Sequence, residues 1–157
     1  MNRLVLTLAA ALVCGGGCAT VNTIPGTKVA DTKANREILD VLERYRHAME
    51  DRDATTLLAL AHPSYYEDSG TPLASDDYGY EGLKEVLQKR LSALKTVRYN
   101  IEYRRVAIEG HRAQVDIRYD ASFQIATEMG DRWERNLNDK RIELENDGRR
   151  WLIIAGM

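Results

Sequence analysis

Residues 113–125, with the sequence AQVDIRYDASFQI, decide the fold. Every odd position from Ala113 to Ile125 carries an apolar or aromatic side chain, and every even position between them carries a polar or charged one. A period of two is typical of a β-strand that turns one face to a protein core and the other to water. This stretch therefore predicts a long strand in a sheet with one covered face.

The flanking sequence predicts further strands joined by short turns. Residues 97–103 alternate in the same way, and the alternation changes phase at Arg104-Arg105, which predicts a β-bulge. Residues 109–111, Glu-Gly-His, predict the hairpin turn between these two strands. The remaining elements expected are a turn over 128–132, a long strand over 133–145, a tight turn over 146–148 and a final strand over 151–155.

Two amphipathic helices are predicted before the strands, over residues 32–49 and 80–94. Apolar side chains recur in both at spacings of three and four, and Asp31 stands where it would cap the first helix. Helices followed by an antiparallel meander predict an α+β fold, in which a strongly curved antiparallel sheet wraps around the helices. The shorter elements expected are a helix over 54–61, a strand over 64–68 and a loop over 69–79.

The N-terminus has the pattern of an export signal. Residues 4–13 are apolar apart from Thr7, and this run is too short to span a bilayer, which takes roughly 20 residues. Small residues before Cys18 resemble a bacterial lipoprotein signal, and that resemblance implies cleavage before Cys18 and its lipidation. Ala19 then implies the outer membrane, facing the periplasm. An ordinary secretory cleavage nearby is the alternative, because Gly15 stands where the lipoprotein pattern prefers Leu.

The predicted domain organisation has three parts. They are a signal peptide over 1–17, a lipidated cysteine with a flexible tether over 18–30, and one folded domain over 31–157. Cys14 is expected to leave with the signal, so no cysteine pair would remain in the mature chain for a disulfide.

The order of elements over residues 31–157 resembles the nuclear transport factor 2-like superfamily, also called SnoaL-like. The resemblance is carried by the helix that ends at Arg52-Asp53-Ala54, the Tyr65-Tyr66 strand before Gly70-Thr71, the second long helix, and the final residues 151–157. It implies a cone-shaped, cystatin-like roll with a cavity between sheet and helices. The superfamily contains enzymes, transport factors and many proteins of unknown role, so the fold does not choose among functions.

Polar-tipped aromatic residues expected on the inner surface are the candidate ligand-binding residues, with core filling as the alternative reading. No carboxylate or histidine falls on the expected inner face of the strands, which argues against acid–base catalysis inside the cavity. Tyr66 and Asp68 form the tyrosine and carboxylate pair singled out as candidate catalytic residues, and a strand end entering a loop is their alternative reading. The candidate ligand-binding residues are Tyr45, Tyr99, Tyr103, Tyr119 and Trp133.

Charge and composition exclude other functions. The formal net charge is −2, with 24 acidic and 22 basic residues, which offers no basic surface for nucleic acid. The three histidines lie in different predicted elements, so neither a metal site nor a cofactor is predicted. Charged residues on the other face of the sheet predict cross-strand ion pairs, and with them a monomer or a weak polar dimer. These residues are Arg98, Glu102, Arg104, Asp116, Arg118 and Asp120.

The function predicted first is a lipid-anchored envelope protein whose noncatalytic domain binds a small apolar molecule or contacts another envelope protein. One alternative is an isomerase-like or hydrolase-like enzyme that uses Asp68 with Tyr66. The other is a purely structural domain whose cavity is filled by its own side chains, which Trp133 and Phe123 facing each other would support.

Overall fold

The computed structural model describes residues 22–68 and 76–157. The predicted signal peptide, Cys18 and the first residues of the predicted tether lie outside the described residues. Within the described ranges, no helix combines the length and the apolar character that a membrane span requires.

Three helices form where the apolar periodicity predicts them: α1 (Lys33–Asp51), α2 (Ala54–Leu60) and α3 (Tyr80–Ser92). The N-cap of α1 is Thr32 rather than the predicted Asp31, because the Thr32 hydroxyl accepts the hydrogen bond from the Asn35 amide at 3.1 Å. Asp31 instead pairs with the side chain of Arg36. The third helix ends two residues earlier than predicted, and Leu94 already belongs to the following strand.

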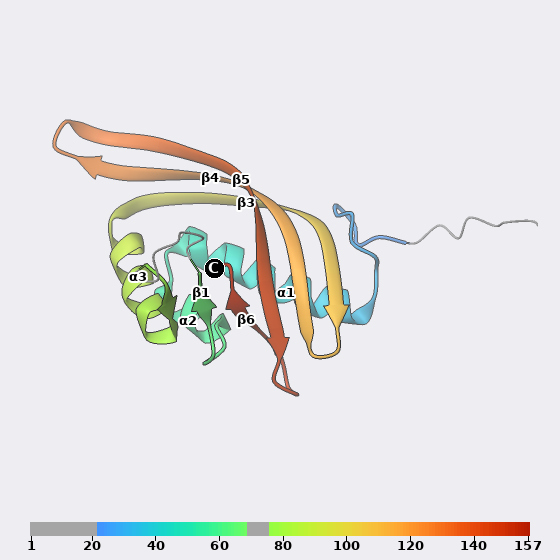
Figure 1. Ribbon diagram of the computed structural model, residues 1–157. Helices are drawn as coiled ribbons and strands as arrows, with labels where there is room; N and C mark the ends of the chain where they lie inside the picture. Colours follow the sequence, from blue (N-terminus) through green and yellow to red (C-terminus); the bar gives the residue numbers. More distant parts are fainter. Residues whose placement is uncertain (1–21, 69–75) are drawn as a thin grey trace, which may run out of the picture.

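The main sheet has four antiparallel strands in the order β3-β4-β5-β6: β3 (Leu94–Glu109), β4 (Arg112–Thr127), β5 (Gly130–Asn146) and β6 (Trp151–Ala155). In Figure 1, β3, β4 and β5 arch over α1, and the closed end of the β4–β5 hairpin projects beyond the helices. The predicted α+β fold with a strongly curved antiparallel sheet around helices is confirmed.

The register confirms the face assignment of the central strand. On β4, Ala113, Val115, Ile117 and Ala121 are at most 2% exposed, so the odd positions face the core. The register shift between Tyr103 and Arg105 is the predicted bulge. It keeps Val106 opposite Val115, so that the apolar side chains after the bulge return to the inner face.

A second, two-stranded sheet lies beside the helices. Its strands are β1 (Tyr66–Glu67) and β2 (Tyr78–Gly79), with Tyr66 opposite Gly79. The first strand falls within the predicted strand over 64–68. The second falls within a stretch predicted as a loop, because two residues show no period by which a strand is recognised.

The core lies between α1, α2 and the sheet. Leu42, Leu57, Val115, Ile142 and Ile153 are completely buried there. Burial of one such side chain contributes about 1.5–3 kcal/mol, so this layer carries much of the stability of the folded domain. The final strand is buried on both faces as predicted, since Trp151, Leu152 and Ile153 are all at most 7% exposed.

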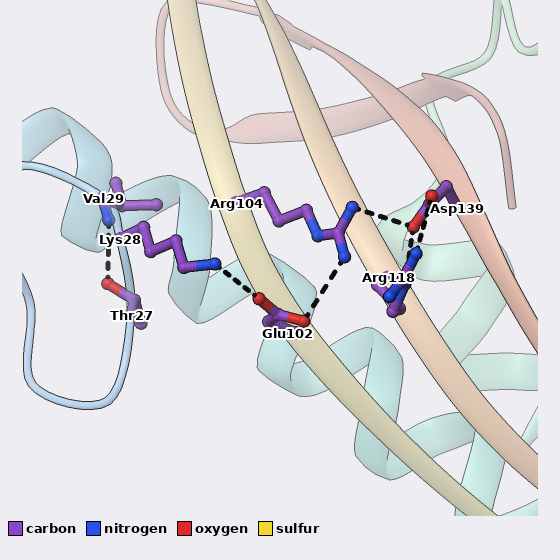
Figure 2. Close-up of polar contacts among 7 residues, drawn as sticks. All are labelled: Thr27, Lys28, Val29, Glu102, Arg104, Arg118 and Asp139. Atoms are coloured by element: carbon purple, nitrogen blue, oxygen red, sulfur yellow. Dashed lines mark hydrogen bonds and ion pairs between the residues drawn. The ribbon is translucent and has the colours of Figure 1, made fainter.

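Residues 22–30, assigned from the sequence to a flexible tether, pack against β3 and α1. Val29 is 2% exposed, and the side-chain amide of Asn35 donates to the Ala30 carbonyl at 2.8 Å. Figure 2 shows the Lys28 ammonium reaching Glu102 on β3, at 3.0 Å. The part of the predicted tether that the structure describes is therefore attached to the domain, which begins before Asp31.

The outer face of the sheet carries the predicted cross-strand ion pairs. In Figure 2, Arg104 lies between Glu102 and Asp139, and Arg118 also contacts Asp139. Pairs exposed to water contribute little stability each, but they give the charged side chains of this face partners of opposite charge. The pairs that join β4 to β5 are Arg112–Glu145, Asp116–Arg141, Arg118–Asp139 and Asp120–Arg135.

Candidate functional site

A cavity of about 450 Å³ lies between the inner face of the sheet and helices α1 and α3. It is open at one end, where the exposed side chains of Arg90, Glu134 and Asn136 form the mouth. Its walls are mostly apolar and aromatic. They include Tyr45 and Met49 from α1, Leu87 and Leu91 from α3, Tyr99 from β3, Tyr119, Phe123 and Ile125 from β4, and Met157.

Three tyrosines form one aromatic group inside the cavity. The rings of Tyr99 and Tyr119 stack with centroids 5.5 Å apart and an interplanar angle of 7°. Tyr45 meets Tyr99 edge to face at 5.8 Å, and their hydroxyl oxygens are 3.4 Å apart. Burial raises the pKa of Tyr45 well above its usual value and that of Tyr99 to about 12. Both phenols therefore stay protonated near neutral pH.

Lys140 is the unexpected member of the cavity lining. It lies on β5 opposite Ile117, two residues before the buried Ile142, and therefore on the inner face. Its Nζ is 6.0 Å from the centroid of the Tyr45 ring. Burial and the charge of Arg90 outweigh the nearby carboxylate of Glu67 and lower the pKa of Lys140 to about 8.

The Glu67 carboxylate, whose charge acts on Lys140, belongs to a partly buried tyrosine and carboxylate pair with Tyr65. The Tyr65 hydroxyl donates to Glu67 Oε2 at 2.5 Å, and the same oxygen accepts the Gly156 amide at 2.9 Å. The Met157 amide donates to the Tyr65 hydroxyl at 3.1 Å. These bonds hold the residues after β6 against β1, which places Met157 in the cavity wall.

The five residues predicted to bind a ligand divide into two groups. Tyr45, Tyr99 and Tyr119 line the cavity. Tyr103 faces inward but not into this cavity, since its hydroxyl donates to Glu43 of α1 at 2.6 Å. Trp133 lies on the outer face, 47% exposed, with the Arg98 guanidinium 5.0 Å above its ring.

The expectation that Trp133 lines the cavity is therefore wrong, and the arrangement that would have supported a cavity filled by its own side chains, Trp133 facing Phe123, is not found. Trp133 pairs with Gln124, whereas Phe123 pairs with Glu134 on the inner face. Ile142 and Leu144 are the buried residues of β5, so its even positions face inward. Neighbouring side chains of a strand point to opposite faces of the sheet, so a one-residue change of phase exchanges the inward and outward residues.

The two candidate catalytic residues, Tyr66 and Asp68, do not line the cavity. Tyr66 is 54% exposed and donates to Asp77 at 2.7 Å, and this bond, with the nearby charge of Asp68, raises its pKa. The prediction is again one residue out of phase with the structure, because the neighbours Tyr65 and Glu67 lie on the more buried side of this strand.

The inner face also carries charged groups that the sequence reasoning missed. Lys140 and Glu134 occupy even positions of β5, as the buried Ile142 and Leu144 do. All four side chains therefore belong to the inner face. The expectation of an inner face without a carboxylate is thus wrong for Glu134. Among residues 22–68 and 76–157, no group of three or more His, Cys, Asp and Glu side chains is placed to hold a metal ion.

Comparison with known proteins supports the fold. No protein-family model and no curated protein matches the sequence. Solved structures do match. They include a nuclear transport factor 2-like superfamily protein from Salmonella enterica, with 12% identity and a TM-score of 0.64, over 77% of this chain and 86% of that one.

Two further matches carry enzyme descriptions. One is a candidate dehydratase of the nuclear transport factor 2-like family from Streptomyces avermitilis, with 14% identity and a TM-score of 0.64, over 78% of this chain and 92% of that one. The other is a candidate scytalone dehydratase from Novosphingobium aromaticivorans, with 12% identity and a TM-score of 0.67, over 78% of this chain and 80% of that one. At these identities the likeness shows the fold alone, and the chain has the nuclear transport factor 2-like fold.

Proposed function

We propose that this protein binds a small, largely apolar molecule in the cavity of the cone and is held in the bacterial envelope by lipid on Cys18. The observation that carries the binding role is the aromatic cavity of about 450 Å³. Pockets for small molecules have volumes of about 300–1,000 Å³ and are lined mostly by apolar and aromatic groups with a few polar ones.

Half-buried side chains in the cavity wall favour a ligand over a cavity closed by its own residues. Tyr119, Phe123 and Ile125 are partly exposed, and all three line the open space. A ligand that covers them gains about 25 cal/mol for each Å² of apolar surface removed from water. The phenol groups, Lys140 and the residues of the mouth supply the polar contacts that would orient it.

The distribution of acids favours binding over turnover. Among the described lining residues, Glu134 is the carboxylate, and it is exposed at the mouth rather than buried inside the cavity, where a catalytic acid or base would act. The alternative enzyme that uses Asp68 and Tyr66 has no support from the geometry, because neither residue lines the cavity.

Native mass spectrometry of the full chain, purified gently from a bacterial envelope, tests this function. We expect a discrete added mass that is lost on denaturation, on a monomer or a weak dimer. Asn136→Trp should reduce the fraction of chains that carry the added mass, since Asn136 lines the mouth. The matched control is Leu137→Trp on the outer face of the same strand, where the side chain is already 57% exposed. A ligand-free chain in both variants and in the wild type would contradict the binding role.

A further inference from the structure

Lys140 differs from the other lysines in its surroundings. It is half-buried in the cavity, and it has no ion pair or hydrogen bond to any described residue. Its Nζ lies over the aromatic ring of Tyr45, 6.0 Å from the ring centroid. The exposed lysines are Lys28, Lys33, Lys84, Lys89 and Lys95.

The groups that face Lys140 come from every element around the cavity. Arg90 on α3 is a second cation, and Glu67 on β1 is the opposing charge. The phenols of Tyr45 and Tyr99 are uncharged near neutral pH. Tyr119 stacks on Tyr99, and Glu134 lies at the exposed mouth. An amine with a pKa of about 8 is neutral in about one molecule in ten at pH 7. That fraction is about 300-fold larger than for a lysine with the ordinary value of 10.5.

We propose that Lys140 Nζ is a nucleophile that forms an imine with the aldehyde or ketone group of a small apolar molecule bound in the cavity. Desolvation in an apolar pocket and a second cation nearby are the two conditions that activate a lysine for this chemistry. Both are present, because aromatic and aliphatic side chains surround the amine and Arg90 lines the same cavity.

The reaction needs only the amine and the carbonyl compound. The lone pair of neutral Nζ forms a bond to the carbonyl carbon, and the π electrons of the carbonyl move to its oxygen, which takes up a proton. The oxygen then leaves as water with the second proton from nitrogen, and the carbon–nitrogen double bond forms. No oxidant or reductant takes part. The inference rests on the proposed function, since both use the same cavity.

Reductive trapping tests the inference. The full chain is incubated at pH 7 with benzaldehyde and cyanoborohydride, which reduces an imine to a stable secondary amine, and the modified residue is located by peptide mass mapping. We expect one reduced probe for each chain, at Lys140, formed at least ten-fold faster than at the exposed lysines. Lys140→Arg should abolish this selective labelling. Lys95→Arg is the matched control, because Lys95 is exposed and pairs with Asp131.

The outcomes separate the imine from the binding role. In one outcome the chain carries a ligand in native mass spectrometry or binds benzyl alcohol, while its exposed lysines are labelled as fast as Lys140. That result overturns the proposed imine and leaves the binding role standing. If the chain has no ligand and no selective labelling, both are overturned. Selectivity among the lysines of the wild-type chain decides the question even if Lys140→Arg fails to fold.

Discussion

The hydroxyl of Tyr103 on β3 donates a hydrogen bond of 2.6 Å to Glu43 on α1, which ties the sheet to the helix that it covers. Burial disfavours the charged form of Glu43, but the hydrogen bonds from Tyr103 and Arg46 outweigh it, and the pKa of Glu43 is lowered. Burial, followed by the bond to Glu43, raises the pKa of Tyr103. The pair is thus a neutral phenol and a carboxylate over the whole range near neutral pH.

Tyr103→Phe should lower the free energy of unfolding by about 1 kcal/mol at pH 7, since it removes a hydrogen bond to a partly exposed charged group. A carboxyl whose pKa is lowered in the folded state stabilises the fold at pH values above its ordinary pKa of 4.5. This contribution is lost as the pH falls through the lowered pKa. The difference between wild type and variant, measured by urea unfolding, should therefore shrink at pH 3. Tyr66→Phe is the control, because its exposed bond to Asp77 should matter little.

Gly156→Ala should destabilise the fold by about 3 kcal/mol or more. A Cβ at this position would lie 2.2 Å from the Arg141 carbonyl oxygen, and the φ of 82° is unfavourable for any residue with a side chain. The movement would also pull the Gly156 amide from Glu67. Thermal unfolding measures the loss.

The matched substitution for this test is Gly110→Ala in the β3–β4 turn. Gly110 has a φ of 60° with open space around it, so the cost there is backbone strain alone, about 1 kcal/mol. Equal effects of the two substitutions would show that the contact with Arg141 is not as close as described.

The lowered pKa of Lys140 predicts a rise of stability with pH. Below about pH 8, Lys140 is protonated in both the folded and the unfolded chain. Between about pH 8 and its ordinary pKa of 10.5, the unfolded chain binds more protons than the folded one, so the free energy of unfolding rises with pH. Relative to Lys140→Met, the wild type should gain on the order of 2 kcal/mol across this window. Comparing each pH with the variant cancels the titration of the tyrosines. A difference between wild type and Lys140→Met that stays flat with pH would mean that the amine is solvated.

Lipidation of Cys18 is tested by metabolic labelling of the full chain with an alkyne fatty acid in a bacterial host. We expect label and membrane fractionation for the wild type and for Cys14→Ser, because the resemblance to a lipoprotein signal implies that Cys14 is removed. Cys18→Ser should lose the label. A wild-type chain without label in the soluble fraction would point to ordinary secretion instead.

Most of the sheet could be predicted because its strands are long and one-sided. In β4 seven apolar or aromatic residues repeat at a period of two, and the change of phase before Val106 marks the bulge. The cap of α1 was missed because Asp31 and Thr32 are both good N-cap residues, and only the contact of Asp31 with Arg36 decides between them.

The cavity could be predicted only where its residues are in phase with a buried neighbour. Tyr99 and Tyr119 satisfy this condition, because Val97 and Ile117 lie two positions before them. Trp133 does not, because its large apolar ring suggested the core while Ile142 fixed the opposite phase. Lys140 was missed because inward positions were found by their apolar side chains, and a charged residue at an inward position does not follow that rule.

The docking of residues 22–30 onto β3 determines how far an anchored domain stands from its lipid. Cys18 and Asn22 are only four residues apart, a span of at most ~14 Å. Figure 1 shows this segment at one end of α1 and α3 at the other, and a helix of 19 residues is ~28 Å long. If lipid on Cys18 anchors the domain as proposed, this short connection would keep it at the bilayer surface. The cavity mouth, at the end of α1 remote from the anchor, would then face the surrounding water rather than the lipid.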